Sequence, residues 1–207
     1  MTNSSRILMR LVLALCLSSP VMAWAQVSPE SLASNTTNEV LRIVRMDQEV
    51  KSGNPAKLHA LVEAKILPHF DFEQMTRLAV ARNWNQANPE QRQALVEQFR
   101  AMLVRTYAAS ISSVADYRIQ FRPVRMQPDD TEVVVSSEVT KPGVPPIIID
   151  YRMARQGDSW KVFDVLVDNV SLVTVYRNSF NSEVRRSGID GLIASLARRN
   201  QQNAGPR

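Results

Sequence analysis

Apolar residues recur every three or four positions through the first half of the chain, which predicts a series of amphipathic helices. The first such pattern begins at Glu39, whereas residues 26–38 are polar and are expected to be irregular. Residues that commonly cap helix N-termini precede the later patterns. They are Asn54 (followed by Pro55), Asp71 (with Gln74 three residues on) and Asn88 (with Gln91 three residues on).

Beyond Ser113 the apolar residues alternate with polar ones, and this period of two is typical of β-strands with one buried face. Short stretches that contain Pro, Gly and Asp separate the alternating segments. Such short connections favour an antiparallel meander, because parallel strands need long crossovers. The four predicted strands span residues 117–122, 132–140, 147–155 and 160–167.

Helical spacing returns at Ser171, and Gly188 is expected to end that helix before a last short one begins at Asp190. Helices before and after one sheet predict an α+β fold, in which N- and C-terminal helices cover a curved antiparallel sheet of about four strands. The composition, 44% apolar and 22% charged, is that of a globular protein. We expect a single domain over residues 26–200 and a disordered tail at 201–207.

The first 25 residues have the pattern of a cleavable signal peptide. Arg6 and Arg10 precede a short apolar run at 11–17, and Ala23 and Ala25 form a small-x-small cleavage site. The run is too short to span a bilayer, which needs about 20 apolar residues. Cleavage after Ala25 would leave 182 of the 207 residues and lower the net charge from +5 to +3.

The signal peptide also contains the single cysteine, Cys16. The exported chain would therefore enter an oxidising compartment without disulfides and depend on its apolar core for stability. Neither a nucleophile elbow, a zinc-protease motif, a Walker loop nor a dinucleotide-binding glycine motif occurs in the sequence. The two histidines, His59 and His69, lack a convincing third metal ligand nearby. We predict no catalytic residues, no metal site and no cofactor.

Asp164 is the one acidic residue inside an otherwise apolar predicted strand. A buried carboxylate is a candidate catalytic group. The simpler interpretation is a structural carboxylate paired with an arginine, for which Arg177 is a plausible partner, or with backbone N–H groups. An enzyme that uses Asp164 on an apolar substrate is therefore kept as an alternative function.

The basic residues are spread over several predicted elements without interleaved aromatic residues. This pattern does not favour nucleic-acid binding. It fits a solvated basic surface, or alternatively attraction to anionic lipid surfaces or acidic partner proteins.

Short motifs follow one another in a characteristic order over residues 35–200, at 66–75, 83–84, 88–92, Phe99, Tyr107, 160–165, 170–172, 176–180 and 188–192. This ordered set resembles the MlaC family, the soluble periplasmic component of the Mla (maintenance of lipid asymmetry) system, also described as the toluene-tolerance family. Ala81 and Arg82 depart from the family pattern, because members often carry a glycine before the Asn-Trp pair at 83–84.

The resemblance implies a nuclear-transport-factor-like fold with an apolar cavity for phospholipid acyl chains, and a location in the periplasm. It implies a carrier of glycerophospholipid that is not an enzyme. Its expected partners are an outer-membrane lipoprotein–porin complex and an inner-membrane transporter with an MCE-domain protein and an ABC ATPase. The carrier itself is expected to be a monomer that binds phospholipid as a ligand. A periplasmic adaptor without a lipid cavity is a second alternative.

The lipid-binding residues are predicted from the apolar face of each strand and helix. In the 160–167 strand both faces are apolar, so the face that lines the cavity stays open. The predicted lining residues are Leu67, Phe70, Met75, Phe99, Met102, Leu103, Ile119, Phe121, Val133, Val135, Ile147, Ile149, Tyr151, Leu172, Val173 and Tyr176.

Overall fold

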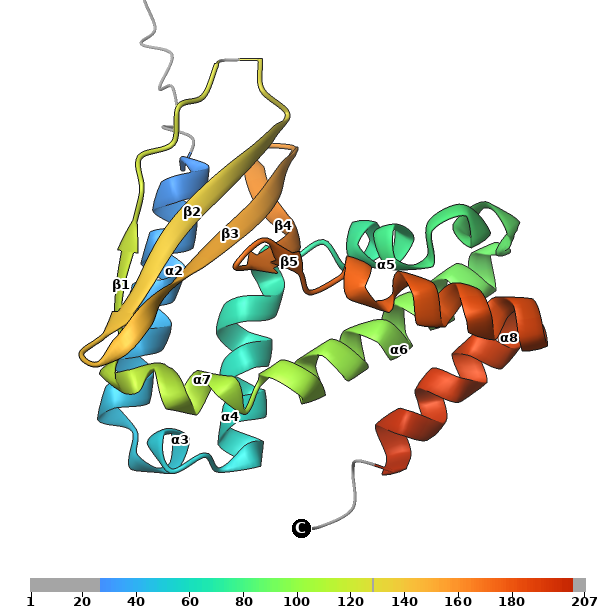
Figure 1. Cartoon of the computed structure of the whole chain (residues 1–207), viewed down its shortest axis with the longest axis horizontal. Helices are drawn as coiled ribbons and strands as arrows, with labels where there is room; N and C mark the ends of the chain where they lie inside the picture. Colours follow the sequence, from blue (N-terminus) through green and yellow to red (C-terminus); the bar gives the residue numbers. More distant parts are fainter. Residues whose placement is uncertain (1–26, 128, 203–207) are drawn as a thin grey trace, which may run out of the picture.

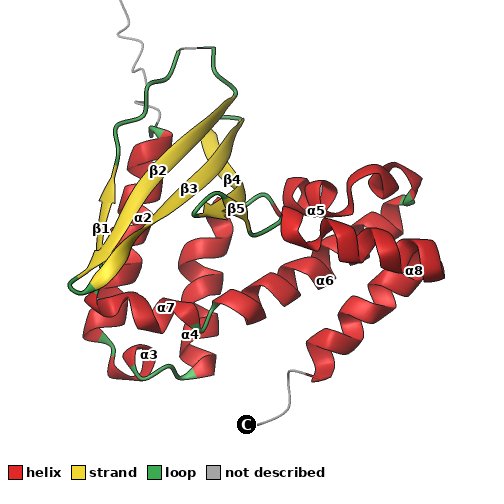
Figure 2. Cartoon of the chain, viewed as in Figure 1, coloured by secondary structure: helices red, strands yellow, loops and turns green. Residues whose placement is uncertain are grey.

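The structure is a computed structural model that describes residues 27–127 and 129–202, so the predicted signal peptide at 1–25 lies outside the described residues. Figure 1 shows two parts. In one, a twisted sheet has a long helix, α2 (Pro29–Met46), along one face. The other is a group of helices that contains α6 (Pro89–Tyr107) and α8 (Arg177–Gln202). The predicted α+β fold class is confirmed, and Figure 2 shows its helices and strands in separate colours.

Helix α2 begins ten residues before the predicted start at Glu39, so the expectation that residues 26–38 are irregular is wrong from Pro29 onward. The Ser28 side chain caps the helix by accepting a hydrogen bond from the Ser31 N–H at 3.1 Å. Pro29 occupies the first helical position, where its missing N–H costs no hydrogen bond. Ser-Pro is thus a start signal of the same kind as Asn54-Pro55.

The three predicted capping residues are confirmed. Asn54 and Asp71 accept hydrogen bonds from the first turns that follow them, and Asn88 forms a capping box with Gln91. The elements between α2 and the sheet are α3 (Gln48–Lys51), α4 (Pro55–Leu61), a π-helical turn η1 (Val62–Ile66), η2 (Leu67–His69), α5 (Phe72–Val80), η3 (Ala81–Gln86), α6, α7 (Ser110–Ser113) and η4 (Val114–Asp116).

The sheet is an antiparallel meander in the order β1-β2-β3-β4-β5. It has one strand more than predicted, because a two-residue strand replaces the expected helix start at Ser171. At the centre of the sheet Val135, Tyr151 and Val165 lie in register on adjacent strands. The strands are β1 (Arg118–Phe121), β2 (Glu132–Lys141), β3 (Val144–Gln156), β4 (Ser159–Val167) and β5 (Val170–Ser171).

An irregularity in β4 settles which of its residues share a face. Met153 pairs with Val162, but the preceding Arg152 pairs with Asp164, so Phe163 is an extra residue in a β-bulge. Because the bulge shifts the alternation by one, Val162 and Val165 face the same side although they are three residues apart. Strict alternation along β4 would have put Val162 and Val165 on opposite faces of the sheet.

The chain enters α8 through η5 (Thr174–Tyr176). Gly188 interrupts α8 with φ 71° and ψ −175°, which confirms the predicted break between two helical segments. The second segment continues to Gln202, two residues past the predicted end of the domain, and residues 203–207 lie outside the described part of the chain.

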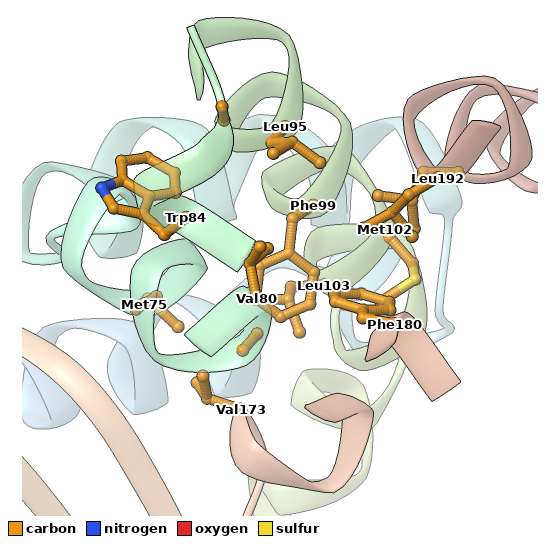
Figure 3. Packing of buried hydrophobic residues seen from close by; sticks show 13 residues of the cluster. Met75, Val80, Trp84, Leu95, Phe99, Met102, Leu103, Val173, Phe180 and Leu192 are labelled. Atoms are coloured by element: carbon orange, nitrogen blue, oxygen red, sulfur yellow. The ribbon is translucent and has the colours of Figure 1, made fainter. Parts of the chain in front are cut away.

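Separate apolar cores stabilise the two parts. In the helical group Phe99 is fully buried, and its ring contacts Phe180 edge-on at a centroid distance of 5.4 Å (Figure 3). In the sheet part Val135, Met153 and Trp160 pack together, and Leu32 of α2 packs against them. A third cluster joins α2 to α3 and α4. Phe70 packs against both the helical core and the sheet core, so the segment that contains it joins the two parts.

The backbone at Gly188 leads to a stability prediction. Its combination of positive φ with extended ψ is accessible almost only to glycine, so Gly188→Ala is expected to lower the free energy of unfolding by about 1–3 kcal/mol. Urea denaturation measures the change. Ser182→Ala on the exposed face of the same helix is the control and should change the free energy by less than about 0.5 kcal/mol. Equal stability of the two variants would contradict the prediction.

Candidate functional site

An apolar pocket of about 180 Å³ lies where the helical group meets the sheet. Its walls come from η1, η2, α5, the C-terminal end of α6, and β4 with the segment that follows it. Almost every lining side chain is a hydrocarbon. The residues are Val62, Ile66, Leu67, Phe70, Phe72, Met75, Leu103, Val104, Tyr107, Ala108, Ile111, Val165, Leu172 and Val173, and we call this the first pocket.

A second pocket of about 240 Å³ lies between α2 and the sheet. It shares Ile66, Phe70 and Ile111 with the first, so the two pockets adjoin, and we call the pair the two-part cavity. The other residues that line the second pocket are Leu32, Ala33, Thr36, Thr37, Val40, Leu41, His69, Ser110, Val114, Ile119, Tyr151, Met153 and Val162.

The position of Phe70 between the pockets is fixed by backbone pairing. Strand β5 pairs only with Leu166 and Val167 at the end of β4. Nearer the start of β4, Val162 forms a parallel bridge with Phe70. The Asp71 N–H donates to the Val162 carbonyl at 2.8 Å, while the Asp71 side chain caps α5. The same two residues therefore attach η2 to the sheet and start the helix that walls the first pocket.

The hydroxyl groups of the two tyrosines in the cavity have hydrogen-bond partners. Tyr107 is bonded to Tyr176, and burial together with this bond raises its pKa. Desolvation also raises the pKa of Tyr151, whose hydroxyl is bonded to Ser137 and to Thr37 of α2. Both tyrosines are thus neutral phenols at physiological pH and present their rings to the cavity.

Eight of the sixteen predicted lining residues lie in the cavity walls. These are Leu67, Phe70, Met75, Leu103, Ile119, Tyr151, Leu172 and Val173.

The other eight predicted residues line neither pocket. Phe99 and Met102 are buried in the helical core, and Tyr176 stacks on Phe180 beside them. Val133 and Val135 are buried in the sheet core, and Phe121 stacks on Tyr151 at a centroid distance of 6.1 Å. Ile147 and Ile149 are half-buried on β3. Sequence periodicity identified their apolar environment, but it does not distinguish a closed core from a cavity wall.

Helix α2 supplies the wall residues that sequence reasoning missed most completely. Leu32, Thr36 and Val40 lie four residues apart and line the second pocket. Two threonines at positions 36 and 37 weaken the apolar pattern, so the helical face was not apparent. The Ser28-Pro29 start signal could have revealed it.

Asp164 lies outside both pockets, on the side of β4 opposite to Val162 and Val165. It is 1% exposed, and its Oδ1 accepts a hydrogen bond from the Ser171 hydroxyl at 2.8 Å. Arg152 is the nearby cation, at 3.9 Å, so the predicted pairing with Arg177 is wrong. Arg177 donates instead to the Leu78 carbonyl. Burial raises the pKa of Asp164, although the Ser171 bond and Arg152 oppose the shift.

The described residues offer little else for chemistry. Over 27–127 and 129–202 there is no group of three or more His, Cys, Asp or Glu side chains that could hold a metal ion. In the same ranges, none of the helices has the length and apolar character needed to cross a membrane.

These features define an α+β protein whose helices and sheet enclose a two-part apolar cavity. A family model described as MlaC protein matches residues 34–198, and the chain therefore belongs to the MlaC family.

Known relatives agree with this assignment. The chain is 24% identical over 202 residues to the toluene tolerance protein Ttg2D of Pseudomonas putida, with 94% of each chain covered. It is 21% identical over 177 residues to the intermembrane phospholipid transport system binding protein MlaC of Haemophilus influenzae, with 84% of this chain and 83% of that one covered. It is also similar to the solved structure of a phospholipid-binding protein from Ralstonia solanacearum in complex with a phospholipid. That match has a TM-score of 0.77 and 35% identity, and it covers 85% of this chain and 98% of the other.

The environment of Asp164 predicts how stability depends on pH. A carboxyl group with a raised pKa in the folded state stabilises the fold below its unfolded pKa, and this contribution is lost as pH rises through the folded pKa. Each pKa unit corresponds to about 1.4 kcal/mol. Asp164→Asn keeps an oxygen that can accept from Ser171 but carries no charge. The stability of the unaltered protein relative to Asp164→Asn should therefore fall as pH rises above about 4, the ordinary pKa of an aspartate.

Urea denaturation at a series of pH values measures this difference. Asp158→Asn removes the same charge from an exposed turn and controls for net charge. A relative stability that increases with pH would mean that Ser171 and Arg152 favour the charged carboxylate, contrary to the prediction.

Proposed function

We propose that this protein binds the acyl chains of a phospholipid in the two-part cavity and carries the lipid between membranes. The observation that carries the proposal is the cavity itself, because apolar side chains line almost all of the first pocket and most of the second. Their volumes together fall in the range of roughly 300–1,000 Å³ that is usual for small-molecule sites. The names of the Haemophilus and Ralstonia relatives support a phospholipid as the ligand.

The energetics explain why a carrier is needed. Transfer of one CH₂ group from water to an apolar environment is worth about 0.8 kcal/mol, so a long acyl chain in water costs roughly ten kcal/mol or more. A free phospholipid therefore crosses an aqueous compartment slowly. In the cavity the chain exchanges one apolar environment for another, and extraction from a bilayer can be nearly neutral in free energy.

The cellular setting is part of the proposal. Removal of the signal peptide at 1–25 would release the protein into the periplasm as a monomer. There it would exchange glycerophospholipid with an outer-membrane lipoprotein–porin complex and with an inner-membrane transporter that contains an MCE-domain protein and an ABC ATPase. The carrier would act without catalysis, and the separation of Asp164 from both pockets supports this over an enzyme that uses Asp164. The cavity likewise favours a carrier over an adaptor with a closed core.

The proposal predicts that filling the first pocket blocks lipid loading. Ala108 lines this pocket, and Ala108→Phe would place an aromatic ring where an acyl chain must lie. Overpacking of this kind costs about 1–3 kcal/mol, so bound phospholipid should decrease about tenfold. Native mass spectrometry and lipid extraction of the purified protein measure the bound lipid.

The adjacent residue provides a matched control. Ala109 is exposed and does not line the cavity, so Ala109→Phe should load normally. Circular dichroism confirms that both variants fold. If the unaltered protein carries no phospholipid and takes up none from vesicles, the proposed function is wrong. If Ala108→Phe loads as well as Ala109→Phe, the lipid does not occupy the first pocket.

A further inference from the structure

Polar groups are distributed unevenly between the two pockets. In the first pocket the one polar side chain is Tyr107, whose hydroxyl is bonded to Tyr176. The second pocket has several polar lining residues, and they differ in charge. Thr36, Thr37, Ser110 and Tyr151 are neutral, whereas His69 can carry a positive charge. An amphiphile in this cavity would therefore find a polar environment only at the second pocket.

His69 occupies a half-buried position at the end of η2. Its backbone is held in place because the next residue, Phe70, bridges to Val162. Among the residues that the structure describes, neither ring nitrogen of His69 has a hydrogen-bond partner. The neutral imidazole therefore has one N–H donor and one acceptor nitrogen available to a ligand in the second pocket.

Lys161 does not line the second pocket itself, but it brings a positive charge close to His69. Its Nζ donates a hydrogen bond to the carbonyl of Pro68, the residue before His69. Of the carboxylates in the described residues, Glu39 of α2 is the one that acts on His69, and Lys65 binds it at 2.8 Å. Because Lys65 neutralises Glu39, the His69–Lys161 pair keeps a net positive character.

The charges around His69 affect its titration. Desolvation and the charge of Lys161 lower the pKa of His69, and Glu39 partly opposes this effect. The imidazole is thus held largely neutral at pH 7 beside a permanent cation. An anion placed between the two groups would attract both of them, which offsets the repulsion and the desolvation cost and favours protonated His69.

We propose that His69 and Lys161 form the binding site for the phosphate group of the lipid, so that the headgroup lies at the second pocket and an acyl chain extends past Phe70 into the first. The inference rests on the proposed function, because it takes a phospholipid as the ligand. The phosphodiester is the one negative charge that all common glycerophospholipids share, and a lysine ammonium and an imidazolium both donate charge-assisted hydrogen bonds to it. The neutral hydroxyls of the second pocket can solvate the glycerol ester groups.

The experiment compares two probes with identical chains. Emptied protein is titrated with dioleoyl phosphatidylglycerol and with dioleoylglycerol, which lacks the phosphate. The unaltered protein should bind the phospholipid more tightly, and His69→Gln or Lys161→Gln should reduce this preference by about tenfold. The controls are His59→Gln and Lys57→Gln, which remove an exposed histidine and an exposed lysine from α4, and these should keep the preference.

The preference should also depend on pH through His69. Since binding of the phosphate raises the pKa of His69, affinity for phosphatidylglycerol should increase as pH falls from 8 to 5.5. His69→Gln should lack this increase, while His59→Gln should retain it. Affinity for dioleoylglycerol should not show it in any variant.

The possible results separate the inference from the proposed function. If both probes bind equally well and the variants change nothing, the phosphate site is wrong while acyl-chain binding stands. If neither probe binds, the proposed function fails. In a last experiment, emptied protein is titrated with inorganic phosphate alone, and NMR of the His69 ring detects binding. Saturation at millimolar phosphate without lipid would identify a site for free phosphate and overturn the headgroup assignment.

Discussion

The attachment of the 70–71 segment to β4 is the interaction on which the cavity depends. Asp71 donates its N–H to Val162, caps α5 with one carboxylate oxygen, and accepts a hydrogen bond from the Gln156 side chain at 2.6 Å with the other. Phe70 packs against both the helical core and the sheet core. Two adjacent residues therefore fix the distance between the two parts of the molecule, and the space left between them is the cavity.

The bulge at Phe163 gives β4 two functions within a few residues. It directs Val162 to the second pocket and Val165 to the first, so a single strand contributes apolar wall to both. It also turns Asp164 to the opposite side, where Ser171 binds its carboxylate. A carboxylate in the cavity wall would be costly to desolvate against hydrocarbon chains, and the bulge keeps it away.

The cavity walls combine an apolar surface with satisfied polar groups. The Tyr107 and Tyr151 hydroxyls are bonded to protein partners, so binding of hydrocarbon leaves neither of them without a hydrogen bond. His69 is the exception, because it lines the second pocket and its nearest permanent cation is Lys161, which is held by the Pro68 carbonyl beside it. This arrangement gives the cavity a direction, with a dry end for chains and a charged end for a headgroup.

The sequence by itself determined the α+β class, the helix caps at Asn54, Asp71 and Asn88, the antiparallel order of the strands and the break at Gly188. These depend on local chemistry, namely side chain to backbone hydrogen bonds, the period of apolar residues and the backbone freedom of glycine. Only the tertiary structure decided that Leu103 lines a pocket while Phe99, one helical turn earlier, fills a core. Both are apolar residues on one helix, and their difference lies in how far the neighbouring elements approach, which the 70–71 attachment and the bulge at Phe163 set.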